Sequence, residues 1–215
     1  LTPAALTVSE AGGITTVAID SNGDGIADAS FQLTGSYEAG SITVGGDGNI
    51  HYVPPVSITG TAGEDSIVGT ALNDTLSGVA GDDTLIGLDG ADIIDGGAGA
   101  DLISGGAGSD DLTGGLGSDT FTGTLAQFDG DAIADFQEGD VIEVTDVALT
   151  PAALTVSEAG GITTVAIDSN GDGVADASFQ LIGAFETGSI VVGADGGIHY
   201  VPAVSITGTD GDDLI

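Results

Sequence analysis

The sequence predicts an all-β protein in which a parallel β-roll alternates with small antiparallel β modules. Three observations support this prediction. A nine-residue repeat runs without a break from Gly60 to Thr122, and the residues before it alternate between apolar and polar as strands do. In addition, the first 67 residues return almost unchanged 148 positions later. A fixed short repeat of this kind is the sequence signature of a solenoid, because each unit can bury its apolar side only against its neighbours.

The nine-residue repeat has seven units, with glycine at the first place, aspartate at the sixth and an apolar residue at the eighth. The aspartates are Asp65, Asp74, Asp83, Asp92, Asp101, Asp110 and Asp119. The apolar residues are Ile67, Leu76, Leu85, Ile94, Ile103, Leu112 and Phe121. Glycines ahead of the aspartate permit a sharp turn, and the last three residues of a unit can alternate outward, inward, outward. We therefore expect each unit to be a turn plus a three-residue strand, and two units to form one coil.

Stacked coils place their strands about 4.8 Å apart and therefore also stack their aspartates. One edge of the roll is expected to carry Asp65, Asp83, Asp101 and Asp119, and the other Asp74, Asp92 and Asp110. Neighbouring carboxylates at this spacing repel by about 3 kcal/mol at an effective dielectric constant near 20, so cations are needed between them. Calcium fits, because it accepts six to eight oxygen ligands in flexible geometry, whereas magnesium tolerates carbonyl cages poorly. A solvated loop tract without metal is the alternative, but it does not explain the strict phase of the apolar residues.

The seven units closely resemble the RTX family of calcium-bound β-rolls. This resemblance implies several calcium ions per repeat and a bacterial protein exported by type I secretion. Leu72 departs from the pattern, since it replaces the turn glycine of the second unit, and we expect the 69–77 turn and its ligand set to differ. The segment 128–144 is similar to the segment that closes such rolls. Its apolar residues are expected to cap the solenoid: Phe128, Ile133, Phe136, Val141 and Ile142. Its acidic residues could complete the last calcium shell or be solvated, and we expect solvation for most of them: Asp129, Asp131, Asp135 and Asp140.

Residues 149–215 repeat residues 1–67 with twelve substitutions. This duplication predicts a tandem array with a period of 148 residues. We expect a β-rich cap or linker module at 1–56, the roll at 57–127, a cap with the second copy of the module at 128–204, and the start of another roll at 205–215. In that next roll Asp213 takes the place of Asp65. Because the chain begins without methionine or a signal peptide, we expect it to be a segment of a longer protein.

The β-rich module has alternating strands at 15–19 and 29–33, followed by a hairpin in which residues 41–44 and 50–53 pair. The loop between the first two strands resembles the start of an EF-hand calcium loop and offers four candidate ligands: Asp20, Asn22, Asp24 and Asp28. The second copy offers Asp168, Asn170, Asp172 and Asp176. The pattern is incomplete, because Phe31 stands where an EF-hand has a bidentate glutamate. An Asx-type hairpin turn without metal is therefore an equal alternative.

The composition excludes several classes of partner. The chain has 34 acidic residues and neither lysine nor arginine, which gives a net charge of −34. Without cations it cannot neutralise phosphates, so nucleic acid and anionic membranes are not expected as partners. The absence of cysteine excludes disulfides and thiol chemistry, and no apolar run is long enough for a membrane span. A halophilic origin would also explain the acidity, but not the nine-residue phase.

No enzyme motif of the H-E-x-x-H, G-x-S-x-G or P-loop type occurs in the sequence. His51 and His199 hold the same position in the two copies, and we interpret them as packing or surface residues. The favoured hypothesis is a non-enzymatic repeat of an extracellular fibre, adhesin stalk or surface layer, with calcium ions and other copies of itself as partners. The alternative is the secretion and folding module of an RTX-type hydrolase whose catalytic domain lies outside this sequence.

Overall fold

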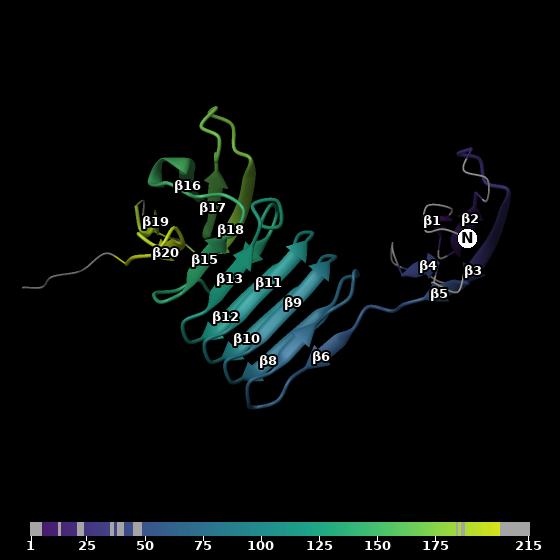
Figure 1. Cartoon of the computed structure of the whole chain (residues 1–215), viewed down its shortest axis with the longest axis horizontal. Coiled ribbons are helices and arrows are strands. Elements are labelled where there is room, and N and C mark those ends of the chain that lie inside the picture. The colour runs from purple at the N-terminus through teal and green to yellow at the C-terminus, as the bar shows by residue number, and fades with distance from the viewer. Residues whose placement is uncertain are drawn as a thin grey trace, which may run out of the picture.

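The computed structural model describes residues 6–12, 14–20, 24–34, 37, 41–44, 49–183, 185 and 188–202. Within these residues the fold is all-β, with one short 3-10 turn, η2, at Pro151–Ala153. Figure 1 shows a flattened parallel β-roll in the middle of the chain and a small β module on each side of it. The predicted fold class is confirmed. No helix among the described residues is long and apolar enough to cross a membrane.

The roll consists of two facing parallel sheets whose strands alternate along the chain. One face contains β6 (Ser57–Thr59), β8 (Thr75–Ala80), β10 (Ile93–Ala98), β12 (Asp111–Leu116) and β14 (Ala132–Ile133). The other contains β7 (Ser66–Val68), β9 (Thr84–Asp89), β11 (Leu102–Ala107), β13 (Thr120–Gly123) and β15 (Val141–Val144). Ile94 pairs with Leu76 on one side and Leu112 on the other, so two nine-residue units make one coil.

The interior of the roll is a single file of apolar side chains. All seven eighth-place residues are buried, and Leu85, Ile94, Ile103 and Phe121 have no exposed surface. Each such side chain stabilises the fold by about 1.5–3 kcal/mol relative to an exposed one. The next inward position is the first-place glycine, so the two sheets lie close together with little room for a second row of side chains.

The strands are longer than the three residues predicted. Five of them run for six residues, from the seventh place of one unit to the third place of the next. The pairing skips the first-place glycine and resumes at the second place, which has a positive φ, as at Gly97 and Gly106. Val79 and Leu88 take the same conformation with φ of 85° and 89°. The sequence pattern suggests that the second place belongs to a turn. In the structure the neighbouring coils impose the same backbone path on every unit, so strand pairing continues at this place.

The second module continues both sheets of the roll. It consists of β16 (Leu154–Ala159), β17 (Ile162–Ile167), β18 (Ala177–Ile182), β19 (Ile190–Val192) and β20 (Ile198–Tyr200). β18 pairs in parallel with β14, and β20 pairs antiparallel with β15. The sheets thereby grow to eight and seven strands. Phe128, Ile133, Phe136 and Ile142 are buried at this junction, as predicted for capping residues, and Val141 is half-buried.

The first module has the same strands in the same order. A three-stranded antiparallel sheet contains β1 (Leu6–Ala11), β2 (Ile14–Ile19) and β3 (Ala29–Thr34), and a hairpin pairs β4 (Ile42–Val44) with β5 (Ile50–Tyr52). The strands predicted at 15–19 and 29–33 and the predicted hairpin are therefore confirmed, although burial does not alternate along β3. Figure 1 shows this module apart from the roll, to which a single extended segment connects it.

Candidate calcium ladder

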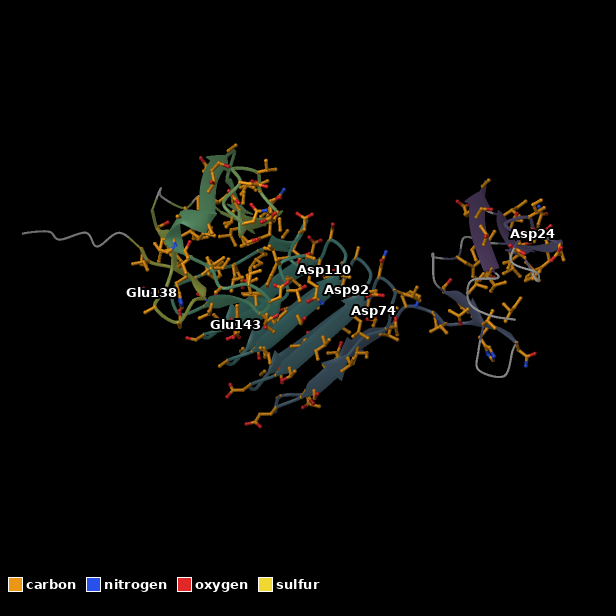
Figure 2. All side chains as sticks on the ribbon, turned by 45° about the horizontal axis from the view of Figure 1, so that its top comes forward. Asp24, Asp74, Asp92, Asp110, Glu138 and Glu143 are labelled. Carbon is orange, nitrogen blue, oxygen red and sulfur yellow. The ribbon has the colours of Figure 1, made fainter. Side chains whose placement is uncertain are left out.

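The sixth-place aspartates form two ladders along the edges of the roll. On one edge each aspartate amide donates to the carboxylate Oδ1 of the aspartate eighteen residues later: Asp65 to Asp83 at 2.7 Å, Asp83 to Asp101 at 2.8 Å and Asp101 to Asp119 at 3.0 Å. On the other edge Asp74 donates to Asp92 at 2.7 Å, and Asp92 to Asp110 at 2.8 Å. Figure 2 labels Asp74, Asp92 and Asp110, which follow one another along the roll. The structure thus has the two sets of aspartates predicted from the nine-residue period.

One oxygen of several ladder carboxylates lacks any hydrogen-bond donor. The Oδ2 atoms of Asp83, Asp101, Asp110 and Asp119 are buried and have no hydrogen-bond partner among the described residues. All four side chains are at most 2% exposed. A buried carboxylate without a partner costs several kcal/mol, so the folded chain needs either a cation or a proton at these oxygens.

Backbone carbonyls lie beside these carboxylate oxygens. A Cβ atom added to Gly78 would lie less than 3.0 Å from both Asp83 Oδ2 and the Gly96 carbonyl oxygen. At Gly96 the same space is bounded by Asp101 Oδ2 and the Gly114 carbonyl oxygen. The first-place glycine therefore keeps open a space in which carboxylate and carbonyl oxygens converge. Hard oxygen donors in a flexible turn suit calcium, which prefers six to eight oxygens.

No three acidic or histidine side chains gather at one point in the described part of the chain. A cation in the ladder would therefore be held by few carboxylates together with backbone carbonyls. This donor set is the one expected from stacked turns, and it fits calcium better than magnesium, which demands near-ideal octahedral geometry and dehydrates reluctantly.

The first two units differ from the others. Asp65 Oδ2 accepts hydrogen bonds from the backbone amide and the hydroxyl of Thr61, and Asp74 Oδ2 accepts the same pair from Thr70. The threonine hydroxyls thus supply donors that the later units lack. Leu72 is 3% exposed and lacks the positive φ of the fourth-place glycines from Gly81 to Gly117, so the 69–77 turn departs from the later turns as predicted. Gly63 of the first unit lacks a positive φ as well.

The acidic residues of the closing segment extend the ladders, and the expectation that most of them are solvated was wrong. Asp131 Oδ1 accepts from the Asp110 amide at 2.9 Å and Asp140 Oδ1 accepts from the Asp119 amide at 3.0 Å. Both side chains are at most 2% exposed. Asp135 accepts from the Gly114 and Gly115 amides, so only Asp129 of the four is fully at the surface.

A signal for Asp131 and Asp140 was present in the sequence. They are nine residues apart, each follows a glycine, and each precedes a buried isoleucine by two residues. A three-residue insertion after the seventh unit shifts their phase, so the offset along each ladder changes from eighteen to twenty-one residues. A search for the Gly-Asp-x-Ile motif, without requiring the fixed nine-residue phase, would have found both aspartates.

Burial raises the pKa values of five carboxyls toward the carboxyl-terminal end of the ladders. Desolvation is the main cause for Asp101, Asp110, Asp119 and Asp140, whose pKa values lie above the ordinary value of 3.8. The pKa of Asp131 rises to about 7, mainly through burial and further through the charges of Asp110 and Asp129. A proton and a cation therefore compete for the same oxygens.

We expect the calcium-free protein to be more stable at about pH 5 than at about pH 8. The folded-state pKa of Asp131 lies above its unfolded value, so its contribution is full below 3.8 and is lost as the pH rises through about 7. Thermal unfolding in chelator at the two pH values measures this difference. Asp131→Asn should reduce it, whereas Glu138→Gln, which removes a charge from an exposed site, should change it little. A higher unfolding temperature at pH 8 in chelator contradicts the expectation.

The two EF-hand-like loops use their carboxylates within the loop itself. Asp168 accepts from the Gly171 and Gly173 amides, and Asp176 accepts from the amide and hydroxyl of Ser169. The Ser169 hydroxyl lowers the pKa of Asp176. In the first copy, Asp20 accepts from Gly25 and Asp24 from Ile26. These are the bonds of an Asx-type turn, and metal binding here stays a prediction. Asn22 and Asp213 lie outside the described residues.

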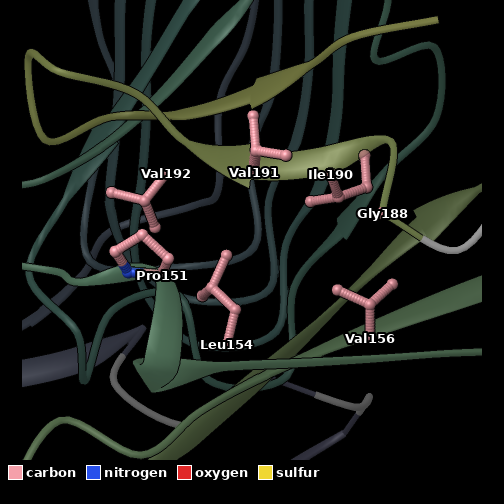
Figure 3. A pocket seen from close by; sticks show the side chains of 7 residues that line it. All are labelled: Pro151, Leu154, Val156, Gly188, Ile190, Val191 and Val192. Carbon is pink, nitrogen blue, oxygen red and sulfur yellow. The ribbon is translucent and has the colours of Figure 1, made fainter. Parts of the chain in front are cut away.

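A His–Asp pair and an apolar pocket lie in the second module, outside the ladders. His199 Nε2 lies 2.9 Å from Asp195 Oδ1, which lowers the pKa of that carboxyl and links the β19–β20 turn to β20. Figure 3 shows a pocket between η2, β16 and β19. Its volume is about 260 Å³. It is lined by Pro151, Leu154, Val156, Gly188, Ile190, Val191 and Val192, none of which carries a titratable group.

Comparisons with known proteins identify the repeat. The model of the RTX calcium-binding nonapeptide repeat matches residues 59–94, 68–103 and 86–121. Curated protein sequences give no match. Among solved structures, the AlgE6R2 subunit of the Azotobacter vinelandii mannuronan C5-epimerase is 27% identical, with 61% of this chain and 85% of that chain covered and a TM-score of 0.31. The AlgE6R3 subunit of the same enzyme is 22% identical, with 73% and 94% covered and a TM-score of 0.29.

The extracellular lipase LipA from Serratia marcescens is 17% identical, with 84% of this chain but only 29% of the lipase covered and a TM-score of 0.29. TM-scores this low leave the repeat itself as the basis for assignment. The nonapeptide match, the parallel roll and the buried aspartate ladders agree with one another. The roll of this chain therefore belongs to the RTX calcium-binding nonapeptide repeats, and calcium is its cofactor.

Proposed function

We propose that this chain is a repeat of a long secreted structural protein that folds and stiffens when it binds calcium outside the cell. A fibre, an adhesin stalk or a surface layer would use such a repeat. The observation that carries the proposal is the buried ladder of carboxylates whose second oxygens lack donors in the folded chain. A chain with this ladder and a net charge of −34 requires cations to become compact.

The calcium ligands are the sixth-place aspartates from Asp65 to Asp119 together with carbonyls of the first-place glycines. Asp131 and Asp140 continue the same two edges and complete the last coil. The sites of the first coil, at Asp65 and Asp74, are weaker, because threonine donors already satisfy these carboxylates. Since the ligands converge only in the folded roll, the free energy of ion binding contributes directly to folding.

Calcium-coupled folding provides a switch between the two sides of the cell envelope. At low cytosolic calcium the carboxylates repel one another, and the chain stays expanded and suitable for export. At millimolar calcium outside the cell the coils stack. RTX repeats are typical of secreted bacterial proteins, which supports export by type I secretion.

The duplication supports an array rather than a single folding module. The second module pairs with the last coil through β14 and β15. After the module, residues 205–209 repeat residues 57–61, with which the first roll starts. Roll, cap and module are thus proposed to alternate with a period of 148 residues, with boundaries at 57, 128 and 205. Near identity of the two copies is expected of interchangeable spacers, and no catalytic role is assigned to them.

A test of the array is to join three copies of residues 57–204 and image the product with and without calcium. We expect straight particles in calcium whose length grows in proportion to the number of copies, and shorter, coil-like particles in chelator. Particles whose copies are flexibly connected in calcium would contradict a stiff fibre. The surrounding reading frame provides a second check, because an upstream H-E-x-x-H or G-x-S-x-G motif would instead favour the secretion module of a hydrolase.

A further inference from the structure

The two copies of the β module have the same sequence at their apolar face but bury it differently. Phe179 is 1% exposed, whereas Phe31 at the equivalent position is 38% exposed. Leu181 and Ile198 have no exposed surface, whereas their counterparts Leu33 and Ile50 are only half-buried. The difference therefore arises from what packs on the face and not from its residues.

In the second copy the end of the roll covers this face. Ile133 of β14 pairs with Leu181, and Ile142 of β15 pairs with Ile198. The rings of Phe128 and Phe179 lie 5.8 Å apart. The last coil thus provides both the strands and the aromatic ring that bury the apolar side of the module.

Backbone hydrogen bonds fix the register of this junction. The Ser178 amide donates to Asp129 Oδ1 at 2.9 Å, and the Gln180 amide donates to the Asp131 carbonyl at 2.8 Å. The Gly130 amide donates in return to the Ser178 carbonyl at 2.8 Å. Both polar and apolar groups of β18 therefore depend on the roll end for their partners.

In the first copy the same face is open. A hollow of about 260 Å³ is lined by Phe31, Leu33, Ile42, Ile50, His51 and Tyr52. β3 lies at the edge of its three-stranded sheet, since among the described strands it pairs with β2 alone. An exposed strand edge with apolar side chains beside it is a surface that soluble proteins normally cover.

We infer that the face formed by β3 and β5 docks on the carboxyl-terminal end of a β-roll that precedes Leu1 in the same polypeptide. The occupant has the chemistry of residues 128–146: two short strands, a phenylalanine ring placed as that of Phe128, a carboxylate placed as that of Asp129 and a backbone carbonyl placed as that of Asp131. None of the twelve differences between the copies falls within 29–33 or 50–52, so the contacts of the second copy can form again without change. If the register of the second copy is kept, Leu33 pairs with the residue of the preceding roll that corresponds to Ile133. Ile50 likewise pairs with the residue that corresponds to Ile142.

A second molecule of this chain is a poor occupant. The roll in the described part of the chain carries β18 and β20 on its last coil, so the matching surface is already covered. A preceding roll in the same polypeptide would offer that surface at the correct place in the chain. The second module follows Ala148 directly with residues 149–154, and these are identical to residues 1–6 at the start of the first module. The inference rests on the tandem arrangement proposed above.

The test is to fuse a copy of residues 57–148 ahead of Leu1 and compare the extended chain with the present one in saturating calcium. Amide hydrogen exchange of Ser30 and Gln32 should slow by about ten-fold or more in the extended chain, because both amides gain acceptors. Ser178 and Gln180 serve as matched controls and should stay protected in both. Unchanged exchange at Ser30 and Gln32, with Ser178 and Gln180 protected, would overturn the inference.

Cysteine labelling gives an independent readout, since the chain contains no cysteine. Phe31→Cys should react quickly in the present chain and about ten-fold more slowly in the extended one. Phe179→Cys should be slow in both chains, and Ile26→Cys, in a loop where Ile26 is 71% exposed, fast in both. If labelling of Phe31→Cys in the present chain becomes slower as the protein concentration rises, a second copy is the occupant. That result would overturn the assignment. All samples are folded in calcium, so failure of docking is distinguishable from failure of calcium-dependent folding.

Discussion

Removal of calcium with EDTA at neutral pH should abolish most of the β-sheet circular dichroism of the chain and expand it. The reason is that the folded roll buries the carboxylates of Asp83, Asp101, Asp110 and Asp119 with one oxygen each lacking a donor. Without cations, stacked neighbours repel by about 3 kcal/mol per pair, which is as large as the stabilisation by one buried apolar residue in the file. Circular dichroism and small-angle scattering across a calcium titration from micromolar to millimolar measure the effect.

Magnesium is the control for this titration. Because it retains its waters and tolerates carbonyl cages poorly, it should restore much less structure than calcium at equal concentration. Ionic strength should be held constant, since general screening also reduces the repulsion of a chain with a net charge of −34. A spectrum and a radius of gyration indifferent to calcium over the whole range would refute calcium-coupled folding.

Asp101→Ala should weaken calcium-dependent folding much more than Asp65→Ala. Asp101 is 2% exposed, its Oδ1 accepts from Asp83, and its own amide donates to Asp119, so it connects two layers of the ladder. Asp65 stands at the start of its edge, is half-buried, and already has its Oδ2 bonded to Thr61. We expect losses on the order of 3 kcal/mol and 1 kcal/mol in the free energy of unfolding in calcium.

The comparison needs a variant that separates ion binding from hydrogen bonding. Asp101→Asn keeps an oxygen for the Asp83 amide but removes the charge, so it should lose calcium affinity nearly as Asp101→Ala does while retaining more stability in chelator at low pH. Calorimetric titration and thermal unfolding of the three variants provide the measurements. Equal calcium affinities for Asp65→Ala and Asp101→Ala would count against ligands shared between layers.

Much of the roll could be predicted from the sequence because its rule is local. A nine-residue period sets which residues share a coil, and parallel strands at fixed spacing then stack identical places on one another. The two aspartate ladders and the file from Ile67 to Phe121 follow directly from this rule and are present in the structure. Where the period breaks, prediction from the period alone fails. The three-residue insertion before Asp131 therefore concealed the last two ladder positions, although they keep the Gly-Asp-x-Ile pattern.

By itself the sequence determined the fold class, the repeat, the ladder aspartates and the preference for calcium, because each depends on residue type and spacing. Only the tertiary structure decided which carboxylate oxygens lack donors and which have a threonine beside them, as at Thr61 and Thr70. It also decided that Phe179 is buried while Phe31 is exposed. The physical reason is that burial and hydrogen bonding depend on what packs against a residue, and two identical stretches of chain can have different neighbours.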